Sequence, residues 1–176
     1  MKRLFIIILA VLISCGAAFA NPESESIVRL DGGFATYGTS KLEASMGIHF
    51  GATLVTRHFD FSFNNRFLNI GFKDQYLAQS VLAMHYRYFI PQVPLTVFAG
   101  PGLGAAMALF DGDRTGFLGQ FDAGAEYAVS QRMAVVGKLY WAYMVFTEGN
   151  SRTEIGGAGV EVGMRFAFSD LNPMRY

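Results

Sequence analysis

The segment Ile155–Phe168 constrains the fold more than any other part of this chain, because its residues alternate strictly between two kinds. Even positions from 158 to 168 are all apolar, whereas odd positions from 157 to 167 carry glycine, alanine and two opposite charges, Glu161 and Arg165. Successive side chains of a strand point to opposite faces. The segment is therefore predicted to be a strand with one apolar face and one small, polar face, which suits a wall between hydrocarbon and a narrow polar interior.

The same alternation recurs after residue 20, and the helical i, i+3, i+4 spacing of apolar residues is rare. We predict eight strands, most with about a dozen residues. That is longer than the five or six residues typical of soluble sheets, and it exceeds the roughly 9–11 that cross a bilayer at a tilt. The predicted ranges are Ile27–Tyr37, Lys41–Val55, Phe59–Phe72, Gln79–Ile90, Leu95–Phe110, Gly116–Val129, Met133–Phe146 and Ile155–Phe168.

The third predicted strand changes phase. It begins with Phe59, Phe61 and Phe63 on the outer face and continues with Leu68, Ile70 and Phe72 there. A change of phase requires an extra residue, so a β-bulge is predicted at Asn64-Asn65-Arg66. The alternative is a tight turn at Asn64-Asn65, which would change the strand count.

A closed barrel accounts for the two faces of these strands. In hydrocarbon every backbone N–H and C=O must be paired within the protein, and a closed antiparallel barrel pairs them without leaving an edge. The fold class is therefore predicted to be all-β, a closed antiparallel up-and-down transmembrane β-barrel of eight strands. With an even strand count both chain ends lie on one side, together with turns near 57, 91–94 and 130–132. Loops near 38–40, 73–77, 111–115 and 148–153 lie on the other side.

Charged residues at predicted inward positions are balanced in sign, and buried charges are tolerated when they are paired or hydrated. We therefore expect an internal salt-bridge network rather than an ion-selective lining. The predicted inward charges are Lys41, Glu43, Arg87, Asp122, Glu126, Lys138, Glu161 and Arg165. Outward aromatic residues gather near strand ends, as in the interfacial girdles of membrane barrels.

The amino terminus is typical of a secretory signal peptide, with Met1-Lys2-Arg3, the apolar run Leu4–Ile13 and the cleavage site Ala18-Phe19-Ala20. We expect cleavage of residues 1–20 and a single barrel domain over 21–176, with a short polar tail at 169–176. Alternatively, Leu12-Ile13-Ser14-Cys15 is a lipobox, and Cys15 becomes the lipidated first residue. Because Cys15 is the one cysteine, cleavage after Ala20 excludes disulfides.

Charge gives no reason to expect a nucleic-acid partner. The sequence has 14 basic and 14 acidic residues, and removal of Lys2 and Arg3 with the signal leaves a slight acidic excess. Proteins that bind nucleic acid present a basic surface instead.

The last predicted strand also carries a family resemblance. Glu161-Val162-Gly163-Met164-Arg165-Phe166-Ala167-Phe168 resembles the C-terminal β-signal of outer-membrane barrels: a polar residue, glycine two residues later, then two hydrophobic residues spaced by two. In pattern and length the chain resembles the small OmpA/OmpX-like β-barrel superfamily. The resemblance implies a monomer in the bacterial outer membrane, in contact with the lipid bilayer and lipopolysaccharide. It also implies recognition by the barrel-assembly machinery through Glu161, Gly163, Phe166 and Phe168.

Candidate catalytic residues are few. His49 and His85 are predicted inward, where they would form an acid–base or metal cluster with Asp122 and Glu126. We favour hydrogen-bonded interior histidines, and we predict no catalytic, cofactor-binding or metal-binding residue. Outer-membrane lipid A deacylases pair a histidine with a serine two residues later, but Gly51, Asp60 and Arg87 occupy the corresponding positions here.

Two further motifs are interpreted structurally. Gly100-Pro101-Gly102-Leu103-Gly104 lacks the lysine of a phosphate-binding loop, and Asp111-Gly112-Asp113 is interpreted as an acidic turn. The predicted function is a non-enzymatic structural or surface-interaction role. The alternatives are a narrow porin-like pore or carrier for small molecules, a lipid-modifying enzyme, and a soluble sandwich or lipocalin-like binder.

Overall fold

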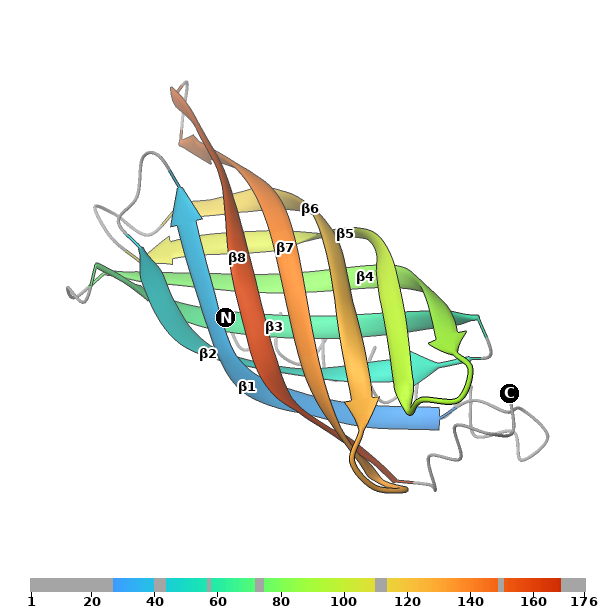
Figure 1. The fold of residues 1–176 in the computed structure, drawn as a ribbon. Helices are drawn as coiled ribbons and strands as arrows, with labels where there is room; N and C mark the ends of the chain where they lie inside the picture. Colours follow the sequence, from blue (N-terminus) through green and yellow to red (C-terminus); the bar gives the residue numbers. More distant parts are fainter. Residues whose placement is uncertain are drawn as a thin grey trace.

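The computed structural model describes residues 27–39, 44–56, 58–71, 75–109, 114–148 and 151–168 of the chain, which form eight strands. Figure 1 shows them side by side in sequence order. The strands are β1 (Ile27–Thr39), β2 (Ser45–Val55), β3 (Phe59–Ile70), β4 (Tyr76–Ile90), β5 (Leu95–Leu109), β6 (Arg114–Ala128), β7 (Met133–Glu148) and β8 (Ser151–Ala167).

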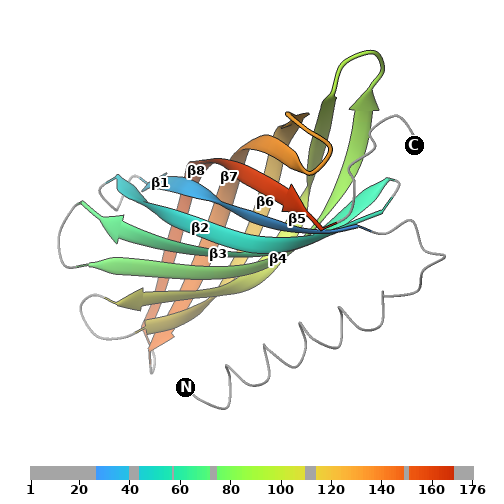
Figure 2. The same ribbon diagram turned by 90° about the horizontal axis from the view of Figure 1, so that it is seen from below.

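Every strand pairs antiparallel with its sequence neighbours, and β1 pairs with β8 to close the barrel. This closing seam runs from Arg29 opposite Ala167 to Thr39 opposite Gly157. Figure 2 shows β1 and β8 adjacent in a second view. The all-β, eight-stranded antiparallel barrel predicted from the sequence is therefore confirmed. Among the described residues, no helix is long and apolar enough to span a membrane.

The two ends of the barrel differ. We call the "turn end" the one that carries Ile27, Ala167 and the connections that follow β2, β4 and β6. The opposite end, the "loop end", carries the connections after β1, β3, β5 and β7. The predicted turns at the turn end are confirmed. At the loop end β7 and β8 continue further than predicted, because Glu148 already pairs with Ser151.

Side chains alternate between the outside and the interior as the sequence pattern predicted. On β8 the even positions Val160, Val162 and Phe166 are exposed, whereas Glu161 and Arg165 are buried inside. The same holds for β4, where Leu82, Met84, Tyr86 and Tyr88 lie outside and His85 is buried. The exterior therefore presents large apolar side chains around the whole barrel, and the polar groups are enclosed.

The predicted bulge in β3 is wrong. The register of β3 with β2 and with β4 runs unbroken through Asn64, Asn65 and Arg66. Leu68 and Ile70 consequently point into the barrel, where they are buried, instead of outward. The alternation pattern gave the wrong phase because a polar residue, Asn65, lies on the outer face. There its Oδ1 accepts a hydrogen bond from the Ser80 hydroxyl of β4 at 2.8 Å. Strand pairing thus satisfies a polar residue that the alternation rule excludes from that face.

Several predicted features lie outside the described residues. They are the signal segment 1–20 with Cys15, the inward charges Lys41 and Glu43, the outward Phe72, the acidic turn at Asp111–Asp113 and the tail at 169–176.

Two apolar clusters fill parts of the interior. The loop-side cluster occupies the half of the barrel near the loop end and includes Leu68, Leu77, Leu118 and Met144, all with no exposed surface. The turn-side cluster is smaller and consists of Ile27, Val55 and Ala167. Between them lies the polar layer that forms the candidate site.

Candidate functional site: the ion-pair network in the barrel interior

Six strands contribute charged side chains to the layer between the two apolar clusters. In the described part of the chain, five basic and five acidic inward side chains form ion pairs with one another. We call this set the central network; it comprises Arg29, Arg66, Arg87, Lys138 and Arg165 with Asp31, Asp60, Asp122, Glu126 and Glu161. The predicted internal salt-bridge network is therefore present.

Glu126 organises the part of the network nearest the turn end. Its carboxylate pairs with Arg29, with Arg165 at 2.7 Å and with Arg87 at 3.5 Å. Arg165 also donates two hydrogen bonds to Asp31, at 2.6 and 3.1 Å, which joins β8 to β1 across the closing seam. Such two-point contacts fix the orientation of both groups as well as their distance.

His85 lies in the middle of the network between two carboxylates. Its Nδ1 is 2.5 Å from Asp60 Oδ1, and its Nε2 is 3.1 Å from Asp122 Oδ1. Both ring nitrogens of His85 therefore face carboxylate oxygens of other strands. Lys138 continues the chain of contacts from Asp122, at 3.5 Å, to Glu161, at 2.7 Å.

Arg66 completes the network on the side of the loop-side cluster. It is fully buried, pairs with Glu161, and donates to the side-chain oxygens of Gln79 at 3.1 Å and Gln120 at 2.8 Å. Its guanidinium also stacks 3.9 Å from the centre of the Tyr140 ring. Arginine suits this place because its planar fork makes several contacts at once.

The described part of the barrel interior contains a small cavity. Its volume is about 10 Å³, and Lys138 and Glu161 of the central network line it together with His49 and His85. This is about the room that one water molecule needs. Both ring nitrogens of His49 lack a hydrogen-bond partner, so a water there would satisfy a buried polar group. The loop-side cluster fills the interior between this cavity and the loop end.

In the described part of the chain, the acid–base groups of the site contact one another. Both nitrogens of His85 face carboxylates, and Ser62, which also lines the small cavity, accepts a hydrogen bond from Asn64. A nucleophilic mechanism needs a hydroxyl or thiol within hydrogen-bond reach of its base. Over the described ranges, no group of three or more His, Cys, Asp or Glu side chains could hold a metal ion. The arrangement neutralises buried charge and links strands.

The structure places the sequence-predicted residues as follows. His85 and Asp122 come together as the cluster hypothesis required, but His49 lies nearer to Glu161, at 3.8 Å, and Glu126 pairs with arginines. Sequence reasoning missed four network members, Arg29, Asp31, Asp60 and Arg66. Alternation in the sequence already indicated an inward position for Arg29 and Asp31, which alternate with apolar residues of β1. In β3 the assumed bulge at Asn64-Asn65-Arg66 concealed the inward position of Arg66.

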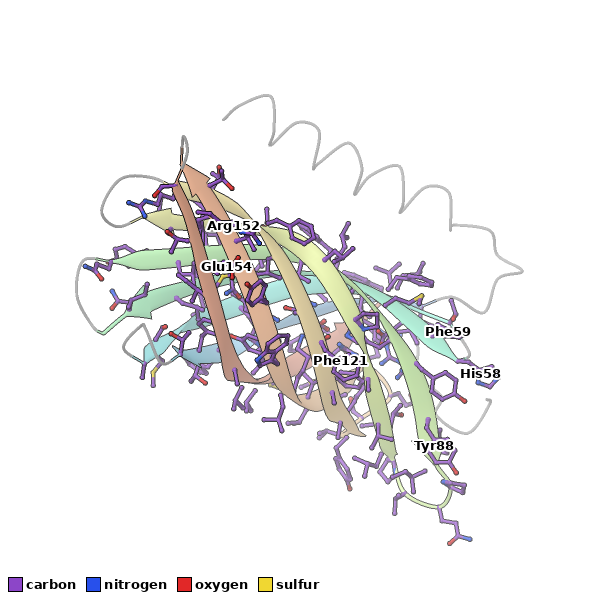
Figure 3. The ribbon with its side chains drawn as sticks, turned by 90° about the horizontal axis from the view of Figure 1, so that it is seen from above. His58, Phe59, Tyr88, Phe121, Arg152 and Glu154 are labelled. Atoms are coloured by element: carbon purple, nitrogen blue, oxygen red, sulfur yellow. The ribbon has the colours of Figure 1, made fainter. Side chains whose placement is uncertain are left out.

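The outer surface has a polar group at the loop end. Arg152 pairs with Glu154 at 2.7 Å on the outside of β8, and the Tyr143 hydroxyl of β7 donates to the same carboxylate. Figure 3 shows Arg152 and Glu154 at the end of the barrel opposite Phe59 and Tyr88. Apolar and aromatic side chains cover the surface between the two ends, so its polarity varies along the barrel axis.

Solved structures with the same architecture are outer-membrane barrels. The crystal structure of neisserial surface protein A (NspA) superposes with a TM-score of 0.66 at 18% identity, over 82% of this chain and 98% of that chain. The N-terminal β-barrel domain of OprF from Pseudomonas aeruginosa gives 0.58 at 15% identity, over 82% and 98%. OprG from the same organism gives 0.57 at 11% identity, over 83% and 97%. No family model and no curated protein matches the sequence.

These likenesses define the class of fold. The chain has the fold of the small eight-stranded outer-membrane β-barrels, as the OmpA/OmpX-like resemblance implied. At these identities the likeness concerns the fold, and the role of the chain has to be argued from its own residues.

Proposed function

We propose that the protein is an integral protein of the bacterial outer membrane with a structural or surface-interaction role and no enzymatic activity. The observation that carries this proposal is the exterior. Leu82, Leu103 and Leu139 of three different strands are each more than 60% exposed at mid-barrel positions, alongside exposed aromatic residues. An apolar surface of this extent is unusual for a soluble protein and is expected for a barrel surrounded by lipid.

The filled interior supports a structural role over transport. A pore needs a continuous aqueous path, whereas Leu68, Leu77, Leu118 and Met144 are packed with no exposed surface across the loop side. Between these residues and the turn end, the cavity beside Lys138 and Glu161 has room for about one water molecule. A pore or carrier of small molecules, the alternative predicted from the sequence, would require this packed interior to open.

The proposed partners are lipid, lipopolysaccharide and the barrel-assembly machinery. Phe166 and Phe168 lie on the outer face near the turn end, where an assembly factor in the periplasm would reach them. Glu161 is buried against Arg66 and Lys138, so contact with its carboxylate requires the barrel to be open. Recognition through Glu161, Gly163, Phe166 and Phe168 therefore precedes closure. We further propose a monomer whose turn end faces the periplasm, with residues 1–20 removed as a signal and residues 21–176 forming the mature domain.

The proposal is tested by membrane fractionation combined with gel migration. We expect the protein in the outer-membrane fraction, and we expect a folded band that migrates differently until the detergent sample is heated. Single-channel recording in planar bilayers then separates the two functions. Stable unitary currents would favour the pore, and extraction from cells without detergent would contradict the membrane assignment itself.

A further inference from the structure

The outer face of β8 does not specify the register in which the barrel closes. A one-residue slip of β8 against β1 would turn its apolar residues inward, and the alternation excludes it. A two-residue slip, however, keeps apolar residues outside, because all even positions from 158 to 168 are apolar. Contacts inside the barrel must therefore select the register of the closing seam.

Two inward tyrosines cross β8 from opposite sides. Tyr37 of β1 and Tyr140 of β7 both lie opposite Gly159 of β8 in the strand register. The Tyr140 hydroxyl donates to the main-chain oxygen of Thr36 on β1, at 2.7 Å. The Tyr37 hydroxyl donates to the main-chain oxygen of Ala142 on β7, at 3.2 Å. Each side chain thus reaches over the last strand to the backbone of the strand beyond it. Figure 1 shows β7, β8 and β1 side by side.

Glycines on β8 make room for these crossings. A Cβ atom on Gly159 would lie 2.4 Å from Cζ of Tyr140, and one on Gly157 would lie 2.8 Å from Cζ of Tyr37. The two rings are nearly parallel, with centroids 6.0 Å apart. Along the described part of β8, positions 157 and 159 are the one place where two consecutive inward residues are glycine.

We infer that Tyr37 and Tyr140, which we call the tyrosine clasp, select the register in which β8 closes the barrel on β1. A two-residue slip in one direction would bring the Tyr37 ring onto Ile155. A slip in the other direction would bring it onto Gly159, where the tip of Tyr140 already lies. The hydroxyls bond to main-chain oxygens, which recur every two residues along a strand, so the rings distinguish the registers.

A second contact acts at the other end of the seam. Arg165 and Asp31 are register partners, and their two hydrogen bonds hold β8 to β1 near the turn end. The clasp lies toward the loop end of the same seam. Because the Arg165–Asp31 contact alone could hold the native register, the clasp is best tested after this contact has been weakened by Asp31→Asn. The inference concerns closure of the barrel and is independent of what the folded barrel does.

Engineered cysteine pairs report the register directly. The expected mature chain has no cysteine, so introduced pairs are the only thiols. Phe34 and Val162 are outward-facing register partners across the seam, and Phe34→Cys with Val162→Cys reports the native register. Phe34→Cys with Val160→Cys or with Met164→Cys reports the two slipped registers. Each pair is oxidised after the protein has folded into lipid vesicles.

Replacing both clasp tyrosines by alanine removes the rings that a slipped register would bring into collision. In the Asp31→Asn background we expect Tyr37→Ala with Tyr140→Ala to produce slipped cross-links, with the ratio of native to slipped product lowered roughly fivefold or more, because relief of overpacking is worth at least about 1 kcal/mol. Tyr143→Ala is the matched control, because this tyrosine of β7 lies outside the barrel, and it should leave the ratio unchanged. Native cross-links alone in the double alanine variant would overturn the inference.

A second measurement covers the case in which the Asp31→Asn background does not fold. With Asp31 retained, Gly159→Ala should slow the appearance of the heat-modifiable folded band, because the new Cβ would collide with the main-chain oxygen of Thr36 and with Tyr140. Gly137→Ala is the control, since a Cβ there meets nothing within 4 Å. Equal folding rates for the two alanine variants would refute the clasp.

Discussion

The contrast between a buried and an exposed ion pair on the same strand gives the sharpest stability prediction. Glu161 of β8 accepts a contact from Lys138 at 2.7 Å, and both side chains are more than 90% buried. Glu154 of the same strand accepts one from Arg152, also at 2.7 Å, but these side chains are 42% and 65% exposed. The two distances are equal, so the sites differ in burial and in the second ion pair that Glu161 forms with Arg66.

Glu161→Gln should therefore destabilise the barrel far more than Glu154→Gln. Removal of one partner of a buried pair costs about 3–5 kcal/mol, because the remaining charge is left uncompensated. We expect about 3 kcal/mol here, since Lys138 keeps Asp122 and Arg66 keeps its two glutamines. Loss of the exposed pair should cost less than about 1 kcal/mol.

The assay is urea unfolding in lipid vesicles, followed by the fluorescence of Trp141. With a slope of about 2 kcal/mol per molar urea, Glu161→Gln should lower the midpoint by about 1.5 M. A double-mutant cycle with Lys138→Met should give a coupling of about 0.5–3 kcal/mol, as expected for direct contact. Equal midpoints for the Glu161 and Glu154 variants would refute the assignment of a dry, charge-paired interior.

Two further predictions address the outer face and the filled lumen. Leu139→Arg, on the exposed outer face of β7, should cost about 2–4 kcal/mol, and Val129→Arg at the turn end about 0–1 kcal/mol, because the proposed membrane position places Leu139 near mid-bilayer and the cost depends on depth. Equal, negligible effects in vesicle unfolding would indicate a water-facing surface. Leu118→Ala should lower the free energy of unfolding by about 2–5 kcal/mol, because it leaves a cavity in the loop-side cluster. Planar-bilayer recordings of this variant should show no unitary current, because Leu68 and Leu77 remain. Stable currents would show that one side chain closes the lumen.

Alternation was sufficient to predict most of the fold because the two faces of most strands differ in polarity and size. β8 is the clearest case, since its even positions are apolar and lie outside, whereas its odd positions carry charges and glycines and lie inside. β3 shows where this reasoning fails. Asn65 on the outer face and Leu68 in the interior both break the rule, and each is stabilised by a partner from another strand that no local pattern reveals.

The candidate site was predictable in kind but not in its pairings. Balanced inward charges indicated an internal network, and six of its members were recognised from their strand positions. Which carboxylate meets which cation depends on strands far apart in the sequence, as with Arg66 and Glu161 or Arg165 and Asp31. The tyrosine clasp escapes sequence analysis for the same reason, because Tyr37 and Tyr140 meet only after the barrel has closed.

The central claim is that the apolar side chains on the outside of the barrel contact lipid, and the single tryptophan tests it most directly. Trp141 lies on the outer face of β7 and is 56% exposed in the isolated barrel. In vesicles, its fluorescence should be blue-shifted and quenched by phospholipids with brominated acyl chains, while aqueous iodide has little effect. Quenching by iodide without quenching by brominated lipid would place this face in water and contradict the account.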